Sequence, residues 1–205
     1  RLAAALPSGS EEGCAALALS AEDYGSCATH APHDDLLRMR AGEACRALAG
    51  ARVALGKDPR SALNDAVADY AFALLMAMAR RVHEGYASMR EGKWSVSWGH
   101  DVGHKTLGII GCGRIGQAVA KRASGFDMKL LGHDVAPNPE AEKLGVKFVP
   151  LDELLAQSDF VSIHAALTPE TRGLIGEKQL RLMKKSAYLI NTARGDHVNE
   201  AALVK

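Results

Sequence analysis

A glycine-rich hexapeptide is the part of the sequence whose residue types point most directly to chemistry. Gly111-Cys112-Gly113-Arg114-Ile115-Gly116 follows an apolar run and opens a helical pattern. In a dinucleotide-binding turn, the first glycine makes the tight turn, the second lets the backbone approach a pyrophosphate, and the third lets helix and strand pack closely. Backbone N–H groups at the helix N-terminus would face the phosphates. The spacing therefore predicts cofactor-binding roles for Gly111, Gly113 and Gly116.

An acidic residue follows at the distance that such a turn requires. Asp134 lies 18 residues beyond Gly116, shortly after the expected second strand. A carboxylate there accepts hydrogen bonds from the ribose hydroxyls of NAD, whereas it would repel the 2′-phosphate of NADP, and no adjacent arginine compensates. We therefore predict NAD as the cofactor. The alternative is that Asp134 is a turn residue beside Pro137 and Pro139.

The elements that must position these residues alternate along the second half of the chain. Short apolar runs, expected to be strands, are separated by helical patterns, which is typical of βαβ units and a parallel sheet buried on both faces. Strands are expected at residues 106–110, 128–131, 147–149, 160–163 and 187–190. Helices are expected at residues 114–123, 140–144, 152–157 and 177–185.

The first half of the chain is less regular. Residues 1–40 show no sustained period, residues 43–48 show a short helical pattern, and residues 51–55 are expected to form a strand before a turn at 56–59. Apolar side chains then recur at helical spacing, so one long helix is expected from an N-cap at Asn64 to about Met89. Its apolar surface would be core or a subunit interface.

Composition excludes several classes of function. The net charge is +1, from 25 basic and 24 acidic side chains, so no global field would attract nucleic acid or a membrane surface. No run of 18 apolar residues is present. The four cysteines lack a paired spacing, and His30, His33, His100 and His104 form no known ligand pattern, so reduced thiols and no metal are expected. We expect a cytoplasmic protein.

Four segments in order resemble the D-isomer-specific 2-hydroxyacid dehydrogenases, with the phosphoglycerate dehydrogenase branch most similar. They are residues 65–75, 105–116, 164–171 and 191–195. The resemblance implies a Rossmann-type doubly wound parallel sheet, an α/β fold, preceded by part of a flavodoxin-like substrate domain. It also implies a homodimer that the long helix helps to form. The expected organisation is a degenerate or partial substrate domain at 1–62, a linking helix and loop at 63–104, and an NAD-binding domain at 105–205.

The resemblance also implies site residues. Arg114 and Ile115 would lie against the pyrophosphate. Arg194 would be the catalytic residue that orients the substrate, since a planar guanidinium can grip the carboxylate of a 2-oxo acid and polarise its carbonyl. A surface salt bridge is the alternative role for Arg194. The remaining residues would line the ribose and nicotinamide, and they are His164, Ala165, Thr171, Thr192 and Ala193.

Parts of the family pattern are absent from the sequence. The family's proton-transferring histidine and its glutamate partner would lie beyond Lys205, and residues 1–42 contain no glycine-rich GVGxDN segment. The NAD-binding domain is therefore expected to be incomplete at its C-terminus, and the chain to be a fragment. His197 follows Arg194 by three residues, but an extra loop histidine is more often solvated than catalytic.

Three functions remain open on the sequence. The first is an NAD-dependent oxidoreductase, or a fragment of one, that transfers hydride between nicotinamide and a small D-2-hydroxy or 2-oxo acid. The second is a non-catalytic, NAD(H)-responsive dimerising module similar to the family's corepressors, which the missing histidine and glutamate favour. The third is another Rossmann protein, such as an adenosylhomocysteinase-like enzyme, and the segment at 191–195 argues against it.

Overall fold

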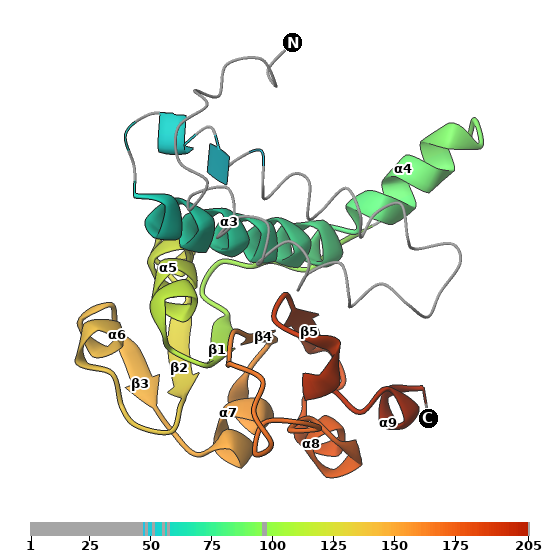
Figure 1. Ribbon diagram of the computed structural model, residues 1–205. Helices are drawn as coiled ribbons and strands as arrows, with labels where there is room; N and C mark the ends of the chain where they lie inside the picture. The colour runs from blue at the N-terminus through green and yellow to red at the C-terminus, as the bar shows by residue number, and fades with distance from the viewer. Residues whose placement is uncertain are drawn as a thin grey trace. The chain divides into compact units, whose positions relative to one another are not determined.

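The computed structural model describes residues 58–95 and 98–204, together with 47, 49, 50, 52–54 and 56. The chain divides into two compact units, Arg1–Tyr70 and Ala71–Lys205. The helix α3 (Pro59–Ala79) contributes residues to both units (Figure 1). Each unit is described by itself below.

The described part of the first unit is helical. Residues 52–54 are helical, so the strand expected at 51–55 is wrong at those positions. A short apolar run is compatible with either element, and here packing decides: Val53 contacts a buried cluster of Ala49, Ala62 and Ala66. Arg52 Nη2 also forms an ion pair with Asp69 Oδ2 at 2.6 Å. Residues 1–46, including the pattern at 43–46, lie outside the described residues.

The single helix expected at 64–89 is two helices, and it begins earlier. Pro59 opens α3, and Asp58 Oδ2 accepts a hydrogen bond from Ser61 N at 2.8 Å, so Asp58 has the capping role expected of Asn64. Arg81 then adopts a left-handed conformation with φ of 52°, which ends the helical path before α4 (Val82–Arg90). The apolar period continues across this break, and for that reason the sequence predicts one helix.

The helix α3 is also long and apolar enough to cross a membrane, by length and composition alone. Core helices of soluble proteins meet the same criterion. Several small or apolar side chains of α3 are buried, among them Ala66, Val67, Ala71 and Leu75. Within the second unit, Phe72 stacks on Phe126 with ring centroids 5.4 Å apart.

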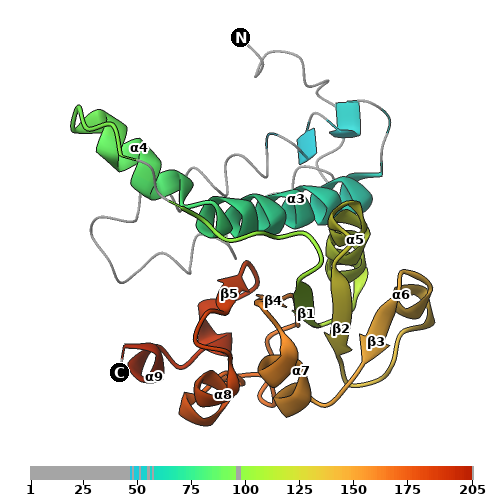
Figure 2. The same ribbon diagram turned by 180° about the vertical axis from the view of Figure 1, so that it is seen from behind.

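A five-stranded parallel sheet forms the centre of the second unit (Figures 1 and 2). Its order is β3-β2-β1-β4-β5, so the chain builds outward in one direction and then crosses to the other side of β1. The expected parallel sheet is confirmed, and each expected strand is present within two residues of its bounds. The strands are β1 (Thr106–Ile110), β2 (Lys129–His133), β3 (Val146–Phe148), β4 (Phe160–Ile163) and β5 (Tyr188–Asn191).

Helices cover both faces of this sheet. Adjacent residues of a strand point to opposite faces, and the space beside Gly108 is filled by Leu154 of α7 (Leu151–Gln157), whereas Ile109 contacts Gly116 of α5 (Arg114–Ala123). Thus α5 and α7 lie on opposite faces. The other elements are η2 (Ser124–Phe126), α6 (Pro139–Lys143), α8 (Glu177–Leu182), η3 (Gly195–His197) and α9 (Glu200–Leu203).

The strand register sets where the site lies. Ile110, the last residue of β1, pairs with His133 of β2 and with Ile163 of β4. The three strands therefore end level at one edge of the sheet, where the crossover from β3 to β4 opens a crevice for ligands in α/β folds.

Candidate active site at the carboxyl edge of the sheet

Gly111 makes the turn that leaves β1. Its φ is +89°, and its amide donates to the carbonyl oxygen of His133 at 2.9 Å. A Cβ atom here would lie 2.4 Å from the amide nitrogen of Ala165, at the end of β4. Only glycine combines this conformation with this approach, so the expected tight turn is present.

The other two glycines have different surroundings. Gly113 precedes the first residue of α5, and a Cβ atom built on it would meet nothing within 4 Å. Gly116 is buried, and its Cβ would lie 2.2 Å from the carbonyl oxygen of Gly111. The helix therefore packs tightly on the turn, while the backbone at Gly113 stays open to a ligand. Arg114 and Ile115 occupy the first turn of α5, whose N–H groups lack partners inside the helix.

Asp134 is bonded to the glycine loop and is not an isolated turn residue. One carboxylate oxygen accepts from Cys112 N at 2.7 Å, and the other accepts from Val135 N at 2.7 Å. The Asp134 side chain is half-buried. Each oxygen keeps a further lone pair, so the carboxylate can still accept bonds from a ribose.

Two residues that sequence reasoning missed hold the other side of Cys112. Its carbonyl oxygen accepts from Gln117 Nε2 at 3.1 Å and from Asn138 Nδ2 at 3.2 Å. Asn138 also caps α6, accepting from Glu140 N at 3.0 Å. An asparagine before a proline is typical of a helix start, but nothing in the local sequence shows that the Asn138 amide reaches back to the glycine loop.

Cys112 is a buried, free thiol. Burial raises the pKa of this thiol to about 12, and the nearby Asp134 carboxylate adds to the rise. The thiol therefore stays protonated at neutral pH and does not act as a nucleophile. Cys14, Cys27 and Cys45 lie outside the described residues.

His164 and Ala165 leave β4 beside the glycine turn. His164 N donates to Ile110 O at 2.7 Å, which extends the ladder between β1 and β4 by one bond. The ring Nε2 of His164 lies 2.8 Å from the Ser162 hydroxyl. Burial lowers the pKa of His164 to about 4, so the ring is neutral at neutral pH. The predicted residues His164, Ala165 and Gly111 are thus brought together.

Asn191 holds the segment after β5 in a tight loop, a role that the sequence alone did not indicate. Asn191 Oδ1 accepts from Ala193 N at 3.0 Å, and Asn191 Nδ2 donates to Arg194 O at 2.7 Å. Thr192 is buried, and its hydroxyl oxygen has no hydrogen-bond partner among the described residues. Arg194 is half-buried and donates from Nη1 to Ala193 O at 3.0 Å.

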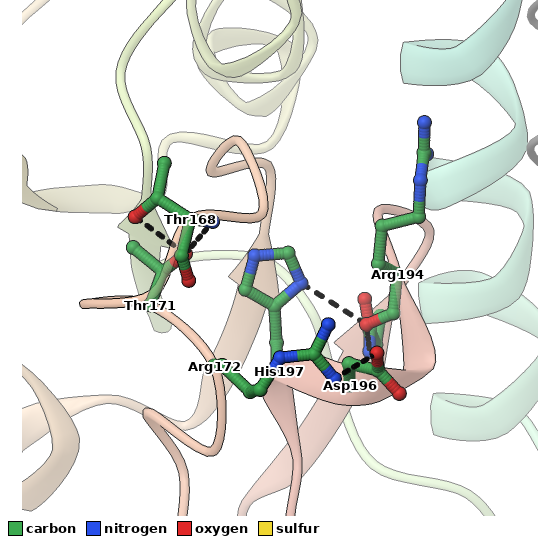
Figure 3. A network of polar contacts seen from close by, with 7 residues as sticks. Thr168, Thr171, Arg172, Arg194, Asp196 and His197 are labelled. Atoms are coloured by element: carbon green, nitrogen blue, oxygen red, sulfur yellow. Dashed lines mark hydrogen bonds and ion pairs between the residues drawn. The ribbon is translucent and has the colours of Figure 1, made fainter.

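A polar network joins the loops that follow β4 and β5 (Figure 3). Thr171, predicted to line the ribose, is engaged within its own loop, donating from Oγ1 to Ala166 O at 2.7 Å. The expectation that His197 is solvated is wrong, because its side chain is fully buried. Its ring lies against backbone carbonyls of both loops. The Arg194 guanidinium extends away from the ring (Figure 3).

These residues fit a dinucleotide. Backbone at Gly113 is open, the turn at Gly111 is pressed against Ala165, and the unpartnered Thr192 hydroxyl lies at the end of β5, where a carboxamide or ribose could bond to it. Within the described residues, no group of three or more His, Cys, Asp or Glu side chains could hold a metal ion.

A family model, protein sequences and solved structures all indicate the same family for this chain. Residues 72–205 match the family model described as D-isomer specific 2-hydroxyacid dehydrogenase, NAD binding domain. A glyoxylate reductase of Korarchaeum cryptofilum is 55% identical over 150 residues, which cover 70% of the chain and 45% of that protein. The apo-structure of D-lactate dehydrogenase from Escherichia coli matches with a TM-score of 0.67 and 36% identity, over 69% of the chain and 45% of that structure.

A structure of D-lactate dehydrogenase from Aquifex aeolicus, complexed with NAD and lactic acid, matches with a TM-score of 0.64 and 37% identity. The match covers 67% of the chain and 42% of that structure. The chain thus spans less than half the length of each of these relatives.

Proposed function

The chain belongs to the D-isomer specific 2-hydroxyacid dehydrogenase family, matched through its NAD-binding domain, and on this premise we propose a specific function. It binds NAD(H) and serves hydride transfer between the nicotinamide and a small D-2-hydroxy acid or 2-oxo acid. The names of the relatives, glyoxylate reductase and D-lactate dehydrogenase, support a substrate of two or three carbons.

One observation carries the proposal. Candidate residues from four strand ends meet at one edge of the sheet: the glycine loop after β1, Asp134 after β2, His164 and Ala165 after β4, and Thr192 to Arg194 after β5. Ligands of open α/β sheets bind at this edge, at the point where the strand order reverses. When bound there, the nicotinamide ring donates or accepts the hydride.

We propose that Asp134 determines the preference for NAD over NADP. Its carboxylate holds the Cys112 amide and keeps lone pairs for the adenosine ribose, and its charge opposes a 2′-phosphate. The glycine loop supplies backbone N–H groups and the N-terminus of α5 to the pyrophosphate. Arg114 and Ile115 are assigned to that contact, and Thr171 to the neighbouring ribose.

Replacement of Asp134 tests this assignment. We expect Asp134→Ala to weaken NADH binding by about tenfold to a hundredfold, because ribose bonds and the bond to Cys112 N are both lost. Affinity for NADPH should fall less, because the like charge is removed, so the preference for NADH narrows. NADH fluorescence titration measures both constants, and Asp101→Ala, which removes an exposed carboxylate before β1, is the control. An unchanged preference would contradict the assignment.

Arg194 is the residue proposed to hold the substrate. It follows Thr192 and Ala193, which are assigned to the nicotinamide, and its backbone is fixed by Asn191. A guanidinium can bond a carboxylate through two parallel hydrogen bonds and can polarise the adjacent carbonyl. Neither His164, bonded to Ser162, nor His197, bonded to backbone, is assigned to proton transfer.

The non-catalytic alternative has less support. The relatives described above carry reductase or dehydrogenase names, which favours hydride transfer over a corepressor-like module. The two functions are distinguished by an assay of glyoxylate or pyruvate reduction by NADH. The sample is a protein that contains this chain and is as long as the relatives. NADH-dependent association without turnover would favour the module.

We also propose a homodimer in which a second copy covers α4. No residue of this helix is buried, yet Val82, Tyr86 and Met89 recur at spacings of four and three residues, so their side chains lie on one face. Their exposures are 57, 64 and 57%. An apolar stripe of this kind on an otherwise polar helix is typical of an interface.

A charge placed on this stripe should prevent association. We expect Tyr86→Glu to convert the protein from dimer to monomer at micromolar concentration. Burying an unpaired carboxylate in the interface costs several kcal/mol, which is comparable to the free energy of dimerisation. Multi-angle light scattering measures the mass. Val204→Glu alters an apolar residue near the C-terminus that is more exposed than Tyr86, at 87%, and it should leave the dimer intact. A dimeric Tyr86→Glu protein would contradict the proposal.

A further inference from the structure

His197 is a buried polar side chain of the second unit that the proposed function does not use. It ends η3 and is fully buried, although the adjacent Asp196 is exposed. A buried imidazole is costly unless its ring nitrogens are bonded. Nδ1 lies 3.0 Å from Arg194 O (Figure 3). Nε2 lies 3.4 Å from Ala166 O.

These two contacts join different loops. Residues 164–175, here called the β4 loop, carry His164, Ala165 and Thr171. Residues 192–199, here called the β5 loop, carry Thr192, Ala193 and Arg194. The His197 ring lies between one carbonyl from each loop. Carbonyl oxygens only accept, and a neutral ring carries a single N–H, so the neutral ring donates to one of the two carbonyls and only a protonated ring would donate to both. A single side chain thus contacts the main chain of both loops that carry candidate ligand-binding residues.

Main-chain hydrogen bonds also join the two loops. Ile175 N donates to His197 O at 2.9 Å, Gly173 N donates to Asp196 O at 2.7 Å, and Asn199 N donates to Ile175 O at 2.9 Å. An exposed ion pair between Arg172 and Asp196 adds to them. Surface pairs of this kind contribute little, so the three main-chain bonds and the buried ring hold the loops together. Of these contacts, the ring is the one that reaches the carbonyl oxygen of Arg194.

We propose that His197 is a positioning residue, which clasps the β4 loop to the β5 loop and so sets the direction from which Arg194 meets a substrate carboxylate. This proposal rests on the proposed function for its ligand, a 2-oxo acid. The ring bonds to the main-chain oxygen of Arg194 itself, so a change at His197 moves the base of the guanidinium side chain without touching the substrate.

Loss of the ring should not unfold the loops. Arg194 O also accepts from Asn191 Nδ2 at 2.7 Å, and Ala166 O also accepts from Thr171 Oγ1 at 2.7 Å. Neither carbonyl is therefore left without a partner in a His197→Leu protein, and leucine fills much of the same buried volume. A His197→Gln protein keeps one side-chain N–H donor near the position of the ring.

The test measures two affinities in the full chain. NADH is titrated first, and oxamate, a stable isostere of pyruvate, is then titrated into the NADH-loaded protein. We expect His197→Leu to bind NADH within about threefold of wild type and oxamate about tenfold more weakly, since a small displacement of a charged group weakens its bonds steeply. We expect His197→Gln to recover most of the oxamate affinity. His83→Leu, at an exposed histidine of α4, is the control.

Hydrogen exchange gives an answer that does not depend on oxamate. In His197→Leu, amides of the β4 and β5 loops should exchange faster, Ile175 and Asn199 included, while those of the glycine loop stay unchanged. If wild type binds NADH but not oxamate, the proposed substrate is wrong. Hydrogen exchange alone then tests whether the His197 ring joins the two loops. Unchanged exchange in both loops, or equal oxamate loss in the leucine and glutamine proteins, would overturn the role of His197.

Discussion

Gly111→Ala is expected to abolish measurable NADH binding and to destabilise the fold by about 3 kcal/mol or more. The residue has a φ of +89°, which costs an L-amino acid about 1–2 kcal/mol. The new methyl group would also lie 2.4 Å from Ala165 N and 2.6 Å from its Cα, which are backbone atoms that cannot rotate away. The turn must therefore shift from β4, and the backbone proposed to bind the pyrophosphate shifts with it.

A second glycine separates the two causes. Gly145 has nearly the same φ, +86°, but a Cβ atom there meets nothing within 4 Å. Gly145→Ala should therefore cost only the conformational part, about 1–2 kcal/mol, and leave NADH affinity unchanged. Urea denaturation and NADH titration of both proteins make the comparison. Equal stability losses, with NADH binding retained in Gly111→Ala, would show that the glycine turn does not form the cofactor site.

Arg194→Ala should remove substrate binding while sparing the cofactor. A guanidinium bonded to a carboxylate in a partly buried site contributes several kcal/mol, so oxamate affinity of the NADH-loaded chain should fall by about a hundredfold or more. Arg194→Lys keeps the charge but cannot form two parallel bonds, and it should recover only part of the loss. NADH affinity should change by less than about threefold, because it rests on the glycine loop and Asp134.

Arg181→Ala supplies the control for this experiment. Arg181 is an exposed arginine of α8, paired with Glu177 at 2.8 Å, and its loss should affect neither ligand. The measurement is calorimetric titration of oxamate with and without NADH. If Arg194→Ala weakens NADH as much as oxamate, the residue supports the cofactor or the loop, and its assignment to the substrate is wrong.

The second half of the fold was predictable because its signals are local. The apolar runs of β1 and β4 and the helical period of α5 each lie within one element, and the bounds of all three agree with those expected. The glycine spacing likewise encodes a turn, a close approach and a packing contact within six residues. Predicted strand ends then place the candidate residues at one edge without further knowledge.

The remaining differences come from contacts between distant residues or from single backbone angles. The apolar period runs across Arg81, so nothing in it reveals the left-handed residue that separates α3 from α4. Asn138 reaches Cys112 across 26 residues, and His197 reaches Ala166 across 31. Residue propensity and spacing do not predict such contacts between residues distant in sequence. The burial of His197 likewise depends on carbonyl oxygens that two separate loops supply.

The proposed cofactor site is tested most directly by calorimetric titration of the purified 205-residue chain with NADH and, in parallel, with NADPH. We predict saturable binding of one NADH per chain, with weaker binding of NADPH because of the charge of Asp134. Binding of neither nucleotide by a folded sample would contradict the cofactor site at the carboxyl edge of the sheet. Tighter binding of NADPH would contradict the role of Asp134.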